Sequence, residues 1–192
     1  MTTLLAGLIV FLGIHSIHLF APGWRDKQIA WIGLLPWKGL YSVVSIIGFV
    51  LIIRGFGLAR HDAGQVWLPP VGMHHATELF TLLAALLITA TYVPRNALKT
   101  SLHHPMVLGA ACWALGHLLA NGSAADVLLF AAFLVWGVVS FVVDRRRDIT
   151  NGTQYPASTA RGTLVTIVVG VVVWVVFAFW LHGPLIGVRP FG

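Results

Sequence analysis

The sequence predicts an all-α integral membrane protein, a bundle of about six transmembrane helices in a single domain that covers residues 1–192. Three observations predict this fold. Only 9% of the residues are charged and 58% are hydrophobic, whereas soluble domains carry about 25% charged residues. Six apolar runs follow one another with short connections between them, each long enough, or nearly so, to cross a hydrocarbon core of about 30 Å. Basic residues gather in alternate connections.

The predicted spans can be marked directly on the chain. The first lacks a basic leading segment and a small-residue cleavage site, so we expect a retained helix rather than a signal peptide. The turn Asn121-Gly122-Ser123 is so short that the helices on either side of it should form an antiparallel hairpin. The last run is rich in valine, but its uninterrupted length favours a helix in lipid. The six runs cover residues 3–21, 40–58, 71–92, 105–120, 124–143 and 162–181.

Orientation follows from the positive-inside rule. The net charge of +6 would suggest nucleic-acid binding in a soluble protein, but here the basic residues lie between apolar runs, so no nucleic-acid partner is expected. The even connections and the C-terminal segment, which would lie on the opposite side of the membrane from the odd connections, hold only Arg60 and Arg189. Arg54 lies near the same end of its helix. The odd connections are therefore predicted to be cytoplasmic and both termini external. The odd connections hold nine of the 12 Lys and Arg residues: Arg25, Lys27, Lys38, Arg95, Lys99, Arg145, Arg146, Arg147 and Arg161.

Nine histidines in so apolar a chain need an explanation. His15 and His18 share one face of the first helix, and His117 lies inside the fourth helix, one turn after Trp113. Ionisable groups inside a bilayer are costly and usually face the bundle interior, and imidazole is a common ligand of metals and haem iron. These three histidines are the best ligand candidates, although each could instead bond to a neighbouring helix. The others lie near helix ends, where imidazole is readily accommodated at the interface: His61, His74, His75, His103, His104 and His182.

Two further residue types could contribute to a site. Glu78 is an acidic residue within an apolar run, four residues after His74, and we expect either a simple His74–Glu78 pair or a carboxylate that orients a ligand histidine. Four tryptophans fall within helices, where they could line a planar cofactor or contact lipid: Trp113, Trp136, Trp174 and Trp180. Walker, HExxH and GxSxG motifs are absent, so nucleotide binding, zinc proteolysis and serine hydrolysis have no support.

Five short motifs follow one another along the chain: Gly13-Ile14-His15-Ser16, Ala21-Pro22-Gly23-Trp24-Arg25, Trp37-Lys38-Gly39-Leu40-Tyr41-Ser42, His104-Pro105-Met106 and the run from Trp113 through His117 to Gly122. In this order and with these gaps, they resemble the motifs of the NnrU family of membrane proteins. The resemblance implies a bacterial inner-membrane protein associated with nitrite and nitric oxide metabolism in denitrifiers. The family is similar to zeta-carotene isomerase (Z-ISO), a haem b enzyme that isomerises a cis double bond of a polyene. A non-enzymatic accessory or sensor protein is a further alternative.

The resemblance also implies a ligand set. Haem b iron would be held by His15 and His117, and a hydrophobic polyene or a redox protein would be the partner. The isomerase branch has a cysteine three residues before the second histidine, where this chain has Ala114. The predicted depths of the two histidines differ, about 18–19 Å against about 10 Å from the outer boundary, which leaves other pairings open. The candidate cofactor-binding residues are His15, His18, His75, His104, His117 and Trp113.

Overall fold

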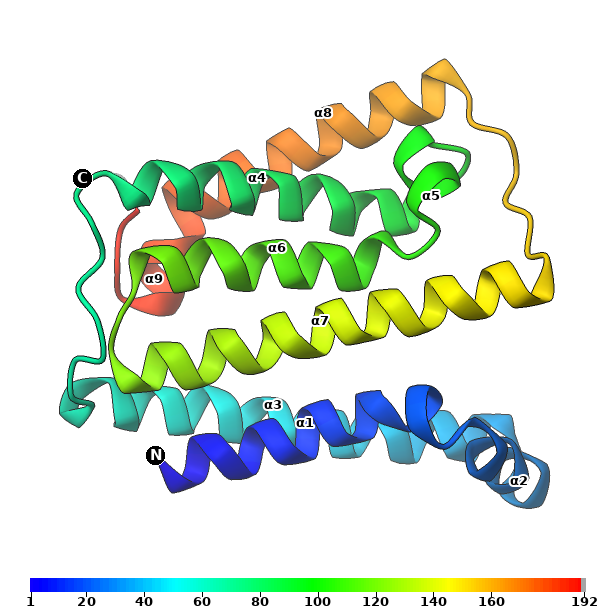
Figure 1. Cartoon of the computed structure of the whole chain (residues 1–192), viewed down its shortest axis with the longest axis horizontal. Helices are drawn as coiled ribbons and strands as arrows, with labels where there is room; N and C mark the ends of the chain where they lie inside the picture. The colour runs from blue at the N-terminus through cyan, green and yellow to red at the C-terminus, as the bar shows by residue number, and fades with distance from the viewer. Residues whose placement is uncertain (191–192) are drawn as a thin grey trace. The chain divides into compact units, whose positions relative to one another are not determined.

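The computed structural model describes residues Met1–Pro190, and within them regular structure is almost entirely helical (Figure 1). One isolated β-bridge joins Gln65 and Ser123. The all-α prediction is confirmed. In chain order the helices are α1 (Thr2–Phe20), α2 (Pro22–Ile32), α3 (Leu34–Asp62), α4 (Met73–Tyr92), α5 (Ala97–Leu102), α6 (Pro105–Ala120), α7 (Ala124–Asn151), α8 (Ala160–Val176), the π-helical turn η1 (Phe177–Leu181) and α9 (His182–Ile186).

Five helical segments are long and apolar enough to cross a membrane, and α6 is a shorter apolar helix. The bundle of about six apolar helices is therefore confirmed, and its surface indicates a lipid environment. The valine-rich run is helical as predicted, with a π turn after α8. Helix α7 has 28 residues, about 42 Å at 1.5 Å per residue, so it is longer than a hydrocarbon core of about 30 Å.

Contacts divide the chain into two compact units, each described here by itself. Unit 1 comprises Met1–Leu68 and Asn121–Trp136, and unit 2 comprises Pro69–Ala120 and Gly137–Gly192. The single domain over the whole chain and the hairpin of α6 with α7 stay predictions.

In unit 1, helices α1 and α3 lie side by side because glycines let their backbones approach (Figure 1). A Cβ at Gly7 would lie 2.6 Å from the Ile52 backbone nitrogen, and one at Gly48 would lie 2.7 Å from that of Phe11. Lipid provides no hydrophobic drive between helices, so such close van der Waals packing has to hold them together. Leu4 is fully buried in this contact region.

Unit 1 also contains a helix that the sequence pattern did not reveal. Residues Pro22–Ile32 form α2, where we predicted a connection. Proline at the first helical position suits a helix start, and Gly33, with φ of 89°, separates α2 from α3. Helix α2 mixes charged and apolar residues and has none that is buried, so a search for apolar runs passes over it.

The end of α3 and the start of α7 are tied together within unit 1. Val66 N–H donates to the Gly122 carbonyl at 2.8 Å, and Ala124 N–H donates to the Gly64 carbonyl at 2.9 Å. Gly122 is needed here because a Cβ would collide with the Trp67 carbonyl oxygen.

In unit 2, helix α4 packs against both α6 and α8 (Figure 1). The Thr77 hydroxyl donates to the Gly116 carbonyl at 2.7 Å, and Trp174 Nε1 donates to the Thr81 hydroxyl at 3.0 Å. These bonds satisfy polar groups that would otherwise face lipid. The third connection folds into α5, where the fully buried Asn96 accepts a bond from Lys99 N–H and caps the helix.

Candidate functional site

His15 lies within α1 and is held in one tautomer by its own helix. Its Nδ1 lies 2.6 Å from the Phe11 carbonyl oxygen. A carbonyl only accepts, so Nδ1 carries the proton and Nε2 carries the lone pair. This is the usual arrangement of a metal-binding histidine, because the bond at one ring nitrogen fixes the orientation of the other.

Aromatic side chains from three helices surround His15 within unit 1. The Phe11 ring stacks on it with centroids 4.2 Å apart. Tyr41 of α3 lies at 5.2 Å, and Trp136 of α7 lies at 6.1 Å with its plane at 90° to the imidazole. His15 therefore faces an aromatic environment suited to a planar, largely apolar ligand.

Trp136 contributes the least expected feature of this environment. Its indole Nε1 is buried and has no hydrogen-bond partner in the chain from Met1 to Pro190; Ser140 Oγ, in unit 2, is the second such atom. The indole nitrogen can only donate, and an unpaired buried donor costs about 1–3 kcal/mol. Such a donor next to a histidine indicates a place where an acceptor from a ligand would fit. Sequence reasoning placed Trp136 among four helical tryptophans and could not single it out.

His117, in α6 of unit 2, repeats the local arrangement of His15. Its Nδ1 lies 2.9 Å from the Trp113 carbonyl oxygen, one turn earlier, which again makes Nε2 the lone-pair nitrogen. The Trp113 ring lies 5.3 Å from the imidazole. The turn is also anchored at Gly116, where a Cβ would lie 2.8 Å from Phe80 Cβ of α4. His15 and His117 belong to different units, so the sharing of one iron stays a prediction.

His103 and His104, which we predicted to lie near a helix end, with His104 also a reserve haem ligand, form a polar cluster with Asp148 in unit 2. His103 Nδ1 and His104 Nε2 each lie 2.8 Å from Asp148 Oδ2. Asp148 is only 13% exposed. Tyr155 covers the cluster, with its ring 4.1 Å from that of His103. Burial, followed by the nearby Asp148 carboxylate, raises the pKa of the Tyr155 phenol above its usual value.

Backbone strain accompanies this cluster. His103 has φ of 66° and ψ of −47°, and His104 N–H donates to the Leu102 carbonyl at 2.8 Å. This is the γ-turn of positive φ, which is rare and strained in a non-glycine residue. The turn directs both imidazoles at one carboxylate. His104, a reserve ligand in the sequence prediction, therefore already uses its Nε2 on Asp148.

The remaining predicted residues are placed as follows. His18 is half-buried, one turn beyond His15 on α1. Glu78 does not form the expected simple pair with His74: its Oε2 lies 3.4 Å from His75 Nδ1, and His74 also lies close by. Helical spacing allows both pairs, and the structure contains the three-residue pair of His75 with Glu78.

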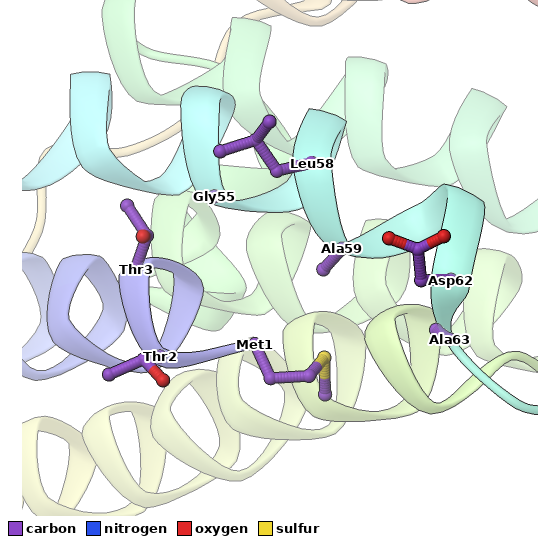
Figure 2. A pocket seen from close by; sticks show the side chains of 8 residues that line it. All are labelled: Met1, Thr2, Thr3, Gly55, Leu58, Ala59, Asp62 and Ala63. Carbon is purple, nitrogen blue, oxygen red and sulfur yellow. The ribbon is translucent and has the colours of Figure 1, made fainter.

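A separate cavity of about 300 Å³ lies between the start of α1 and the end of α3, and Figure 2 shows its lining. Its walls carry a methionine, two threonines, small residues and the Asp62 carboxylate, with no histidine among them. This cavity is therefore distinct from the surroundings of His15. The lining residues are Met1, Thr2, Thr3, Gly55, Leu58, Ala59, Asp62 and Ala63.

These features define a class: a multi-pass, all-α membrane protein with histidines fixed inside its helices. The family model described as NnrU protein matches residues 3–190. The chain belongs to the NnrU family. No curated protein and no solved structure matches it.

Proposed function

We propose that this NnrU-family protein binds haem b, and that His15 and His117 would hold its iron. The observation that carries the proposal is the same in both helices: Nδ1–H donates to the carbonyl four residues earlier, which orients a lone-pair Nε2. Two histidine nitrogens are the donor set of many six-coordinate haem proteins. Both residues occupy the motif positions that the family resemblance implies.

The surroundings of His15 fit such a group. Phe11 and Tyr41 supply aromatic faces for an apolar ring system, and the unpaired Trp136 Nε1 supplies a donor for an acceptor at its edge. The helix carbonyl of Phe11 holds the imidazole in place before any ligand arrives. When bound, haem b would supply one-electron redox chemistry.

We place this redox role in nitrite or nitric oxide physiology, as the family resemblance implies, with a redox protein as partner. A haem-dependent cis–trans isomerase of a carotenoid-like polyene is the second candidate. Its support is the apolar, aromatic environment of His15. The chain has Ala114 where the isomerase branch has a cysteine, and Cys112 lies about 140° around the helix from His117, so ligand exchange through that cysteine has no counterpart here. A non-enzymatic membrane accessory or sensor protein is the third candidate.

The absorption spectrum of the purified protein tests haem binding. In detergent, the preparation should show a Soret band and, after reduction, the sharp α and β bands of six-coordinate haem b, because two imidazoles give a low-spin iron. A preparation that stays colourless after expression with added haem precursor would refute the proposal.

We propose further that both termini lie outside the cytoplasm of a bacterial inner membrane, because the basic residues gather in the odd connections. A reporter that is active only in the cytoplasm should be silent when fused after residue 192 and active when inserted in the connection that contains Gly152, between α7 and α8. The reverse pattern would invert the topology.

A further inference from the structure

A second group of potential metal ligands lies at the start of α4. The ligand atoms of His74, His75 and Glu78 all lie within 4.8 Å of one another. Among residues 1–190, no other group of three His, Cys, Asp or Glu side chains comes together in this way. We propose that these three residues bind a divalent transition-metal ion of the zinc class.

The geometry arises within one helical turn. Gly72 adopts the left-handed conformation, with φ of 89°, and its carbonyl accepts a bond from His75 N–H at 3.1 Å, so α4 begins at Met73. The two imidazole rings that follow lie 4.0 Å apart. Glu78 comes one turn later on the same side. All three proposed ligands therefore come from the first turns of α4.

The types of donor atom in this group determine which metal ions it would prefer. Two neutral imidazoles and one carboxylate suit zinc, copper, nickel and cobalt, whereas magnesium and calcium prefer sites made of oxygen alone. The carboxylate gives the site one negative charge. The His75 side chain is 73% exposed, so water can occupy the remaining coordination positions, as in zinc sites with three protein ligands.

The cluster around Asp148 shows by contrast how loosely His75 is paired with Glu78. There, an adjacent histidine pair also meets a carboxylate, but both imidazole nitrogens lie at full hydrogen-bond distance, 2.8 Å, from the same oxygen. At the start of α4, the distance from His75 Nδ1 to Glu78 Oε2 is 3.4 Å, beyond the usual 2.7–3.2 Å of such bonds. A metal ion coordinated by these atoms would replace only this long contact. Each of the three side chains would gain a coordination bond.

The positive end of the α4 dipole repels a metal cation at this site, but the repulsion is too weak to prevent binding. A helix N-terminus carries about half an elementary positive charge. The Glu78 carboxylate carries a whole negative charge and would coordinate the ion directly, so attraction to the carboxylate exceeds the repulsion from the dipole.

Zinc titration of tag-free protein in detergent, after treatment with a chelator, tests the proposal. Isothermal calorimetry should show one saturable Zn²⁺ site, and Co²⁺ added as a probe should give the absorption bands of nitrogen and oxygen coordination. The doubly substituted variant His74→Ala/His75→Ala and the variant Glu78→Gln should each bind Zn²⁺ about tenfold more weakly or worse, because the first lacks two nitrogen ligands and the second replaces the carboxylate with a neutral amide.

His61→Ala, which removes another exposed histidine, serves as the matched control and should bind Zn²⁺ like the unsubstituted protein. His15→Ala should also retain the site, which separates zinc binding from haem binding. Circular dichroism confirms that each variant is helical, and Glu78→Gln preserves the shape of the side chain. Unchanged affinity in the double variant, or the absence of a saturable site in the unsubstituted protein, would overturn the proposal.

Discussion

Replacing His15 or His117 with alanine is expected to abolish the low-spin haem spectrum. Each substitution removes one proposed axial nitrogen and leaves at most a five-coordinate, high-spin iron. Alanine is well tolerated in a helix, so α1 and α6 should still form and the protein should still insert in the membrane. The measurement is the reduced absorption spectrum of each variant in matched expression, normalised to protein.

Control substitutions separate ligation from a general loss of structure. His61→Ala should leave the spectrum intact, and so should His18→Ala and His75→Ala. His104→Ala should change stability rather than ligation, because His104 Nε2 already lies 2.8 Å from Asp148. If the His18 and His104 variants lost haem while the His15 and His117 variants kept it, the ligand assignment would be wrong. The iron would then be held nearer the predicted cytoplasmic side.

The substitution Gly55→Ala should strongly destabilise the contact of α1 with α3. A Cβ at residue 55 would lie 2.6 Å from Leu4 Cα and 2.7 Å from the Thr3 carbonyl carbon, and backbone atoms cannot yield as a flexible side chain can. Overpacking of this kind costs about 1–3 kcal/mol, and the contact of α1 with α3 would have to open. The measurement is the thermal or denaturant midpoint of the purified variant in detergent.

Gly57→Ala, two residues along the same helix, is the matched control. A Cβ there would meet nothing within 4 Å, so the variant should be as stable as the unsubstituted protein or slightly more stable, since alanine favours a helix. Equal midpoints for the two variants would show that the close approach of α1 and α3 at Gly55 does not exist.

The sequence predicted correctly those helices that consist of long apolar runs. Helix α6 spans the predicted 105–120, because Pro105 cannot lie inside a helix and Asn121-Gly122 ends one. Helix α2 was missed because it is too polar to resemble a span. Helix α3 begins at Leu34, six residues before the predicted apolar run, since the helix continues through Trp37 and Lys38 beyond that run.

The residues of the candidate site could be predicted from the sequence only in part. His15 and His117 could be selected because helix-embedded imidazoles are costly, and their motifs are recognisable. Asp148 lies 44 residues from His104, and no periodicity relates the two. Trp136 is distinguished from other tryptophans only by the absence of an acceptor at its indole nitrogen, which is a property of packing. The residues that sequence reasoning missed are thus those defined by long-range contacts.

Titration of haemin into haem-depleted protein tests the central claim most directly. The unsubstituted protein should bind one equivalent and develop the low-spin spectrum, whereas the double variant His15→Ala/His117→Ala should show only weak, non-saturating uptake. Identical saturation curves for the two proteins, or no specific uptake by either, would contradict the account of this chain as a bis-histidine haem b protein.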